Sequence, residues 1–492
     1  MKKYLLVFVV LFLGLQCLYA QNDFEKYVRE QETAFRKYAA KEDEAFKAYN
    51  DSINKAFGRY LAEAWPDCPL TKSEPPIEKP VPFTEVDPDK ERTLPFRQPV
   101  IGEMELPFRK PSSIPKWDKE HYPEPKIPRL SMGLKMNFFG TECVLLRPSF
   151  VLPRMSGVNE KSVSDYWNAL SDCPHVEWRS QVMKLREDLQ LNDWGIFLLI
   201  NEIFSTYAPH GTENEQVVFS VFTLNQLGYA AKIGRVEDDL IPLIAFDCEV
   251  YNTTFFTIPS ENSRRFSVVN MKHRDLTSVK CQHISYPNAE RSFDVRFACS
   301  PKLGESIMAK TLTDRKHDYM IRYNKNLVDF YATLPCVDFS VYAQASIENI
   351  LWSSLQSELA PMLQGKSEEE SINVLLNFVQ YAFKYEKDHD QYKYEKWNFA
   401  EETIGSSFSD CEDRSILFVQ LVRGLLKMPI VLVNYPGRHL ATAVRFSNPS
   451  TDGDYILVDG KKYLLCDPTY VGARLGMGMP QLKEIPIRII KL

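Results

Sequence analysis

The chain has 492 residues, of which 44% are hydrophobic and 25% charged, and its formal net charge at pH 7 is −6. A chain of this length and composition is globular and has room for more than one domain. Its acidic balance argues against nucleic acids and anionic lipid surfaces as partners.

Residues 1–20 have the pattern of a secretory signal peptide. Lys2 and Lys3 precede an apolar run that ends in small residues at Ala20. Cys17 follows Gly-Leu-Gln, which fits a lipid-attachment signal poorly. We therefore expect a bacterial protein that is secreted or periplasmic, with lipid anchoring as the less favoured alternative. No later segment is long and apolar enough to span a membrane.

An eleven-residue repeat follows at 21–65, where a Phe recurs and each Phe has a Tyr three residues later. The repeated Phe residues are Phe24, Phe35, Phe46 and Phe57. Eleven residues make three helical turns, so the rings form one stripe along an amphipathic helix. Such a stripe has to be buried. Two interpretations stay open: docking to a partner or a second copy, or packing on the chain's own catalytic domain.

The segment 66–129 contains 15 prolines and no sustained apolar periodicity. This composition predicts an extended, semi-rigid linker. An extended chain of this kind could reach a distant partner or could wrap over the chain's own domains.

Residues 130–290 show a mixture of helical and strand patterns, which predicts an α+β domain. Within it, the stretch that starts at Gly211 and Thr212 has a polar turn, an amphipathic helix, a Leu-Gly-Tyr-Ala exit and a strand. The stretch around Cys411 has a similar order, with Thr212 at the position of the cysteine. The domain is then either a degenerate copy of the C-terminal domain or an unrelated accessory domain, and its expected role is binding or bracing.

Residues 291–345 predict a β-rich connection, and a helix pair near 346–384 leads into the last domain. Nine cysteines remain after the predicted signal, so one has no partner for a disulfide. Cys411 is the natural unpaired one. The spacings contain no Cys-x-x-Cys motif and support neither a disulfide map nor a zinc site.

Three motifs near the C-terminus carry the chemistry. Cys411 stands in Ser-Asp-Cys-Glu-Asp, His439 in Gly-Arg-His-Leu-Ala-Thr-Ala-Val, and Asp467 in Cys-Asp-Pro-Thr. Ser409 and Glu412 fit a capping box that starts a helix, and this places Cys411 in the first turn. There the helix dipole favours the thiolate, although the neighbouring acids oppose it.

His439 opens an alternating apolar run that predicts a strand, and Asp467 ends the second arm of a hairpin predicted around Asp459-Gly460. Adjacent antiparallel strands can bring the imidazole and the carboxylate within hydrogen-bond reach. A thiol, a base and an orienting acid in this arrangement are the parts of a cysteine nucleophile.

On these three motifs, residues 370–485 resemble the transglutaminase-like superfamily. The resemblance implies a papain-like catalytic domain at 346–492 with Cys411, His439 and Asp467 as its triad. It also makes the domain at 130–290 a candidate for a degenerate transglutaminase-like copy. Asp410 departs from the family pattern, in which a small or different residue often precedes the cysteine.

The resemblance implies an acyl-transfer enzyme acting on peptide or glutamine-type amides, with hydrolysis expected over transfer to an amine. An oxyanion hole would use the backbone N–H of Cys411 and a donor from upstream, for which Trp397 and Gln391 are candidates. Trp397 could equally be a packed aromatic residue. No metal or organic cofactor is expected, and the expected partner is a protein or peptide substrate.

Two other functions stay open. The chain could be a binding or scaffold protein in which the triad is inactive. It could also be a cross-linking acyltransferase, which would incorporate an amine faster than it hydrolyses the amide.

Overall fold

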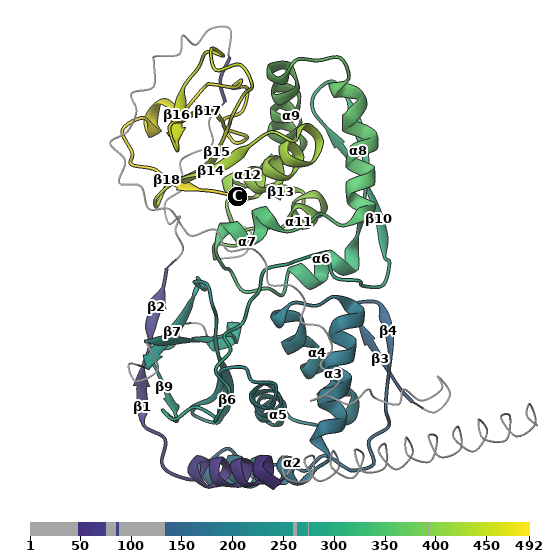
Figure 1. Cartoon of the computed structure of the whole chain (residues 1–492), viewed down its shortest axis with the longest axis vertical. Helices are drawn as coiled ribbons and strands as arrows, with labels where there is room; N and C mark the ends of the chain where they lie inside the picture. The colour runs from purple at the N-terminus through teal and green to yellow at the C-terminus, as the bar shows by residue number, and fades with distance from the viewer. Residues whose placement is uncertain are drawn as a thin grey trace, which may run out of the picture.

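The computed structural model describes residues 48–74, 85–87, 133–258, 263–273, 275–388, 390 and 394–492. The predicted signal peptide, the first half of the predicted helix at 21–65 and most of the predicted linker lie outside these residues. The described chain mixes helices with mostly antiparallel strands, which confirms the general α+β class. Figure 1 shows two bodies. We call the described residues between 133 and 290 the middle unit, and those between 346 and 492 the C-terminal unit.

Residues 48–61 are helical and lie along the middle unit, beside α2 (Glu160–Asp172) (Figure 1). The ring of Phe57 has its centroid 5.1 Å from that of Trp167 and 5.3 Å from that of Tyr286. Leu61 is buried in the same core. The described end of the aromatic stripe therefore packs on the chain's own middle unit. The sequence had predicted packing either on a partner or on the C-terminal domain.

Residues 67–73, at the start of the predicted linker, form two edge strands. They are β1 (Asp67–Pro69) and β2 (Thr71–Ser73), which add to opposite edges of one sheet. An edge strand tolerates the neighbouring prolines because one side of its backbone needs no partner. Further on, the Val86 N–H donates to the carbonyl of Val471 at 2.8 Å. The proline-rich segment thus contacts both units.

The middle unit combines a hairpin, four helices and most of a seven-stranded antiparallel sheet. The hairpin and the helices are β3 (Leu134–Phe138), β4 (Thr141–Leu145), α2, α3 (His175–Leu189), α4 (Asp193–Tyr207) and α5 (Glu213–Gln226). Two of these helices, α3 and α4, are separated at Gln190, whose φ is 55°. The remaining strands are β5 (Ala231–Val236), β6 (Asp239–Ala245), β7 (Thr253–Ile258), β8 (Arg264–Val268) and β9 (Ser278–Cys281), with a 3-10 turn η2 (Met271–His273).

The connection at 291–345 is less β-rich than its sequence predicts. It contains one hairpin, β10 (Ile307–Thr313) and β11 (Asp318–Asn324), followed by α6 (Lys325–Tyr331) and α7 (Phe339–Gln344). The β-branched and aromatic run at 337–343 was expected to be a strand. It forms α7 because its apolar side chains are buried against helix α12 (Cys411–Leu421), so that tertiary packing outweighs β propensity.

The C-terminal unit begins with the helix pair that the sequence predicts near 346–384 and ends in a five-stranded antiparallel sheet. Before the sheet come α8 (Asn349–Leu363), α9 (Glu368–Ala382), β12 (Lys384–Tyr385), α11 (Ala400–Gly405), β13 (Phe408–Ser409), α12 and a π-helical turn η3 (Val422–Leu426). The sheet contains β14 (Ile430–Tyr435), β15 (His439–Val444), β16 (Tyr455–Val458), β17 (Lys461–Cys466) and β18 (Arg488–Ile490), with a 3-10 turn η4 (Pro480–Leu482). The predicted hairpin is confirmed: Val458 pairs with Lys461, and Asp459 and Gly460 both have positive φ, as a tight primed turn requires.

The two units share one topology. In each, a helix (α5 or α12) precedes five antiparallel strands, and the sheet places the fifth strand beside the first, then the second, fourth and third. The order is β9-β5-β6-β8-β7 in the middle unit and β18-β14-β15-β17-β16 in the C-terminal unit. The helix packs against the second strand in both. The middle unit therefore repeats the frame of the C-terminal unit.

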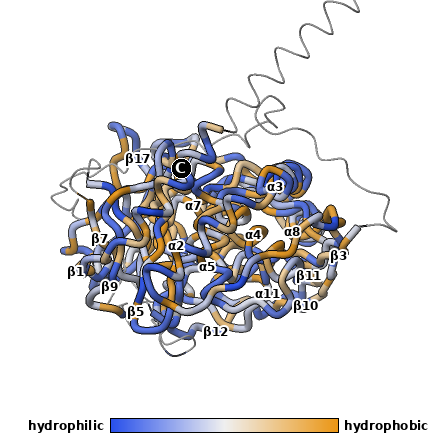
Figure 2. Tube along the Cα trace, turned by 90° about the horizontal axis from the view of Figure 1, so that it is seen from below, coloured by the Kyte–Doolittle hydropathy of each residue, from blue (hydrophilic) through white to orange (hydrophobic). Residues whose placement is uncertain are grey.

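A single hydrophobic core cluster runs through both units, from Leu61 to Ile490. Figure 2 shows hydrophobic segments passing through the interior around α4 and α5. Among the described residues no helix combines the length and the apolar character needed to cross a bilayer.

Removal of the Phe57 ring should destabilise the protein, because this ring joins the helix at 48–61 to the core of the middle unit. Phe57→Ala should lower the free energy of unfolding by about 1–3 kcal/mol, less than the loss for a fully buried Phe. The measurement is a denaturant titration. Tyr49→Ala is the matched control, since Tyr49 belongs to the same stripe but is 56% exposed. Equal effects of the two substitutions would contradict this packing.

Candidate active site

Cys411 is the first residue of α12, and Asp410 is its N-cap with an extended backbone. The capping box predicted between Ser409 and Glu412 does not form. Ser409 lies instead in β13, where its hydroxyl accepts a 3.0 Å hydrogen bond from Arg414 Nε. The Asp410 side chain makes no capping bond, because its carboxylate lies in a group of acids described below.

His439 and Asp467 form a buried hydrogen-bonded pair. His439 Nε2 lies 2.8 Å from Asp467 Oδ2, and the side chains are 0% and 4% exposed. The hairpin register causes this meeting: Thr442 of β15 pairs with Cys466 of β17, and Asp467 follows directly. The other oxygen of Asp467 accepts the backbone N–H of Thr469 at 2.9 Å, which fixes the orientation of the carboxylate.

The second ring nitrogen of His439, Nδ1, is buried and has no hydrogen-bond partner. The sulfur of Cys411 lies beside the same strand start, where the backbone N–H of Leu440 bonds to it and lowers its pKa. Ser415 Oγ donates to the Leu440 carbonyl at 2.9 Å and so ties α12 to β15. The structure thus brings His439 and Asp467 together, but the thiol of Cys411 is hydrogen-bonded to Glu412 and not to His439 Nδ1.

The surroundings of Cys411 favour the protonated form of its thiol. Burial raises its pKa well above the ordinary value, and the carboxylates of Glu412 and Asp410 raise it further. Cys411 Sγ donates to Glu412 Oε2 at 2.9 Å, and the residue is 1% exposed. The expected preference of the helix start for thiolate is therefore outweighed by desolvation and neighbouring negative charge.

Of the two upstream oxyanion candidates, Trp397 is a packed aromatic residue. Its indole N–H donates to the Val337 carbonyl at 2.6 Å, and its ring lies 4.7 Å from that of Phe339. That donor is therefore not directed at the thiol. Gln391 lies outside the described residues.

Two buried residues that support the site had no signal in the motif analysis. Gln380 Nε2 donates to the carbonyls of Asp467, Tyr470 and Ala473 at 3.2, 3.0 and 3.0 Å, and so holds the loop that carries the acid. Arg414 donates to the Phe383 carbonyl at 2.8 Å and anchors the start of α12 to the end of α9.

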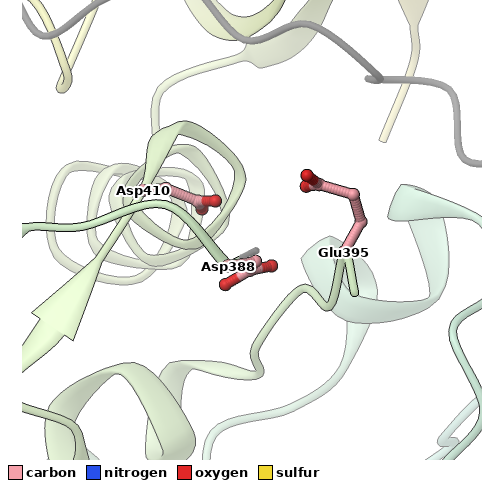
Figure 3. A group of neighbouring side chains, drawn as sticks. All are labelled: Asp388, Glu395 and Asp410. Atoms are coloured by element: carbon pink, nitrogen blue, oxygen red, sulfur yellow. The ribbon is translucent and has the colours of Figure 1, made fainter. Parts of the chain in front are cut away.

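Two buried acids and one half-buried acid lie together beside the start of α12. Asp388, Glu395 and Asp410 each have a carboxylate oxygen within 4.8 Å of the others (Figure 3). Burial raises the pKa of Asp388 to about 10, with the charges of Asp413 and Glu412 adding to the effect. Burial and Glu412 raise the pKa of Glu395 to about 7. These acids come from different segments, so no sequence motif predicts that they lie together.

The corresponding place in the middle unit has no thiol. The N-cap of α5 is Thr212 and that of α12 is Asp410, so the residue equivalent to Cys411 by helix position is Glu213, one residue later than the sequence comparison placed it. The second strand starts with Asp239 where the C-terminal unit has His439.

No model of a known protein family matches this chain, and no curated protein is significantly similar to it. A functional assignment therefore rests on the residues of the site and their geometry.

The raised pKa of Cys411 predicts the pH dependence of its alkylation. Only the thiolate reacts with iodoacetamide, so the midpoint of the rate profile should lie above that of free cysteine. The rate is measured by mass spectrometry of the peptide that contains Cys411. Glu412→Gln should move the midpoint to lower pH, because one of the charges that oppose ionisation is removed. A midpoint below that of free cysteine would contradict the observed environment.

Proposed function

We propose that this chain is a cysteine-dependent acyl-transfer enzyme of the transglutaminase-like kind. The observation that carries the proposal is the buried His439–Asp467 pair at 2.8 Å, whose open Nδ1 lies at the strand start next to the Cys411 helix. A carboxylate on one ring nitrogen fixes the tautomer and stabilises the imidazolium, while the other nitrogen serves as base. We extend the proposal to peptide or glutamine-type amides as substrates and to a secreted or periplasmic location.

The reaction begins with general-base activation, because the thiol is protonated at rest. His439 Nδ1 takes the proton from Cys411 Sγ as the sulfur attacks the amide carbon. The C–N bond breaks, the imidazolium gives its proton to the leaving amine, and a thioester remains. Water activated by the same imidazole then hydrolyses the thioester to a carboxylic acid and restores the thiol. An amine in place of water would give the cross-linking reaction.

A second candidate is a binding protein with an inactive triad. The observation that favours it is the closure of the site: Cys411 is 1% exposed and its thiol is hydrogen-bonded to Glu412 rather than to an imidazole. In this case the buried pair would serve only to hold the sheet against α12.

The two candidates differ in the behaviour of Cys411 toward an amide-mimicking, thiol-directed probe. Nine cysteines lie among the described residues, so labelling has to be resolved by residue with peptide mass spectrometry. The enzyme predicts labelling of Cys411 that His439→Ala slows by about 10²–10⁴-fold, the usual contribution of a general base. A peptide library with and without a fluorescent primary amine then separates hydrolysis from transfer.

Cys466→Ala is the matched control for this experiment, because Cys466 is also fully buried and adjoins Asp467 but has no role in the reaction. It should leave labelling of Cys411 unchanged. Labelling of Cys411 that is equally fast in the wild type and in His439→Ala, together with no turnover of any library peptide, would reject the enzyme and favour the binding protein.

A further inference from the structure

Three carboxylates meet beside the start of α12, and the proposed thiol chemistry uses none of them. Asp388 and Glu395 come from the segment between β12 and α11, and Asp410 is the N-cap of α12. One oxygen of each lies within 4.8 Å of an oxygen of each of the others. Figure 3 shows the three carboxyl groups turned toward a shared space.

Two of these acids have a buried oxygen that no hydrogen bond satisfies. Asp388 Oδ1 and Asp410 Oδ1 have no partner, and their residues are 1% and 2% exposed. The other oxygen of Asp388 accepts only a backbone N–H, that of Lys396, at 2.6 Å. A buried carboxylate oxygen without a partner costs free energy unless a proton or a cation compensates it.

The nearby basic side chains are directed to other groups. Lys396 Nζ bonds to Asn398 and Glu402 at 2.5 and 2.6 Å. The guanidinium of Arg414 donates to the hydroxyl of Ser409 and to backbone carbonyls. These hydrogen bonds do not end on the three acids, on which Arg414 and Lys387 act through their charge.

We propose that Asp388, Glu395 and Asp410 form a binding site for a calcium ion. The three ligands are all carboxylates, which suits a hard cation, and neither a thiolate nor an imidazole belongs to the group. Calcium takes several carboxylate oxygens directly, whereas magnesium usually keeps several waters and binds through only one or two carboxylates, so three protein carboxylates favour calcium.

The proposed site lies directly before the nucleophile, since Asp410 precedes Cys411 in the chain. A bound cation would offset the charge of the acids that crowd the thiol. The inference does not rest on the proposed function, because binding of the ion is measured without any turnover.

The test is calorimetric titration of the chelator-treated full chain with calcium chloride up to about 10 mM, which covers the weak affinities typical of extracellular calcium sites. We expect one calcium ion to bind per chain. Asp388→Asn and Glu395→Gln should each weaken binding by at least about tenfold, since each removes one charged ligand. Magnesium chloride should bind at least about tenfold more weakly than calcium.

Asp390→Asn is the matched control, because it removes an exposed carboxylate from the same segment. It should leave the calcium affinity within about twofold of the wild type. In chelator, Asp388→Asn should melt close to the wild-type temperature, because the amide keeps the shape of the acid and can still accept the Lys396 N–H, so its loss of binding cannot be ascribed to unfolding. The absence of calcium binding to the wild type, or equal affinities in the wild type, Asp388→Asn and Glu395→Gln, would overturn the proposal.

Discussion

The hydrogen bond between His439 and Asp467 is the constraint on which the arrangement of the C-terminal unit depends. A charged or strongly polar pair at the centre of a sheet is tolerated only if every partner is held in place. Here the backbone of the loop after β17 fixes the carboxylate, and Gln380 fixes that loop from the neighbouring helix. The same hairpin register that aligns β15 with β17 also orients the imidazole, so fold and site share one set of contacts.

The surroundings of Cys411 differ from those of the His439–Asp467 pair, because they oppose the ionisation of the side chain that they hold. A helix start normally lowers the pKa of a thiol, yet Cys411 is buried among carboxylates that raise it. In the structure a carboxylate orients the imidazole, whereas the surroundings of the thiol oppose its ionisation. Under the proposed function, activation of the sulfur would require less negative charge around it, or entry of water and substrate.

Local sequence signals anticipated the elements that carry the triad, because each depends on short-range chemistry. The Asp459-Gly460 turn, the alternating strand at His439 and the apolar helix after Cys411 are all formed where expected. The predictions that the structure contradicts concern segments whose conformation depends on tertiary packing. The run that became α7 follows its burial and not its propensity, and edge strands formed where prolines suggested a linker. The pairing of Asp388 with Asp410 depends on how β12, α11 and α12 fold together, which no local pattern records.

The two units share a strand order but carry different side chains at the corresponding position. In the middle unit Glu213, Asp239 and Asn270 line a hollow of about 300 Å³ at the place where the C-terminal unit holds its thiol and imidazole. Glu213, which lines the hollow, forms a largely exposed ion pair with Lys272 at 3.0 Å, and His273 Nε2 lies 3.2 Å from Asp239 Oδ2. One backbone frame thus accepts two unlike sets of side chains, a buried thiol and imidazole in one unit and exposed charged groups in the other.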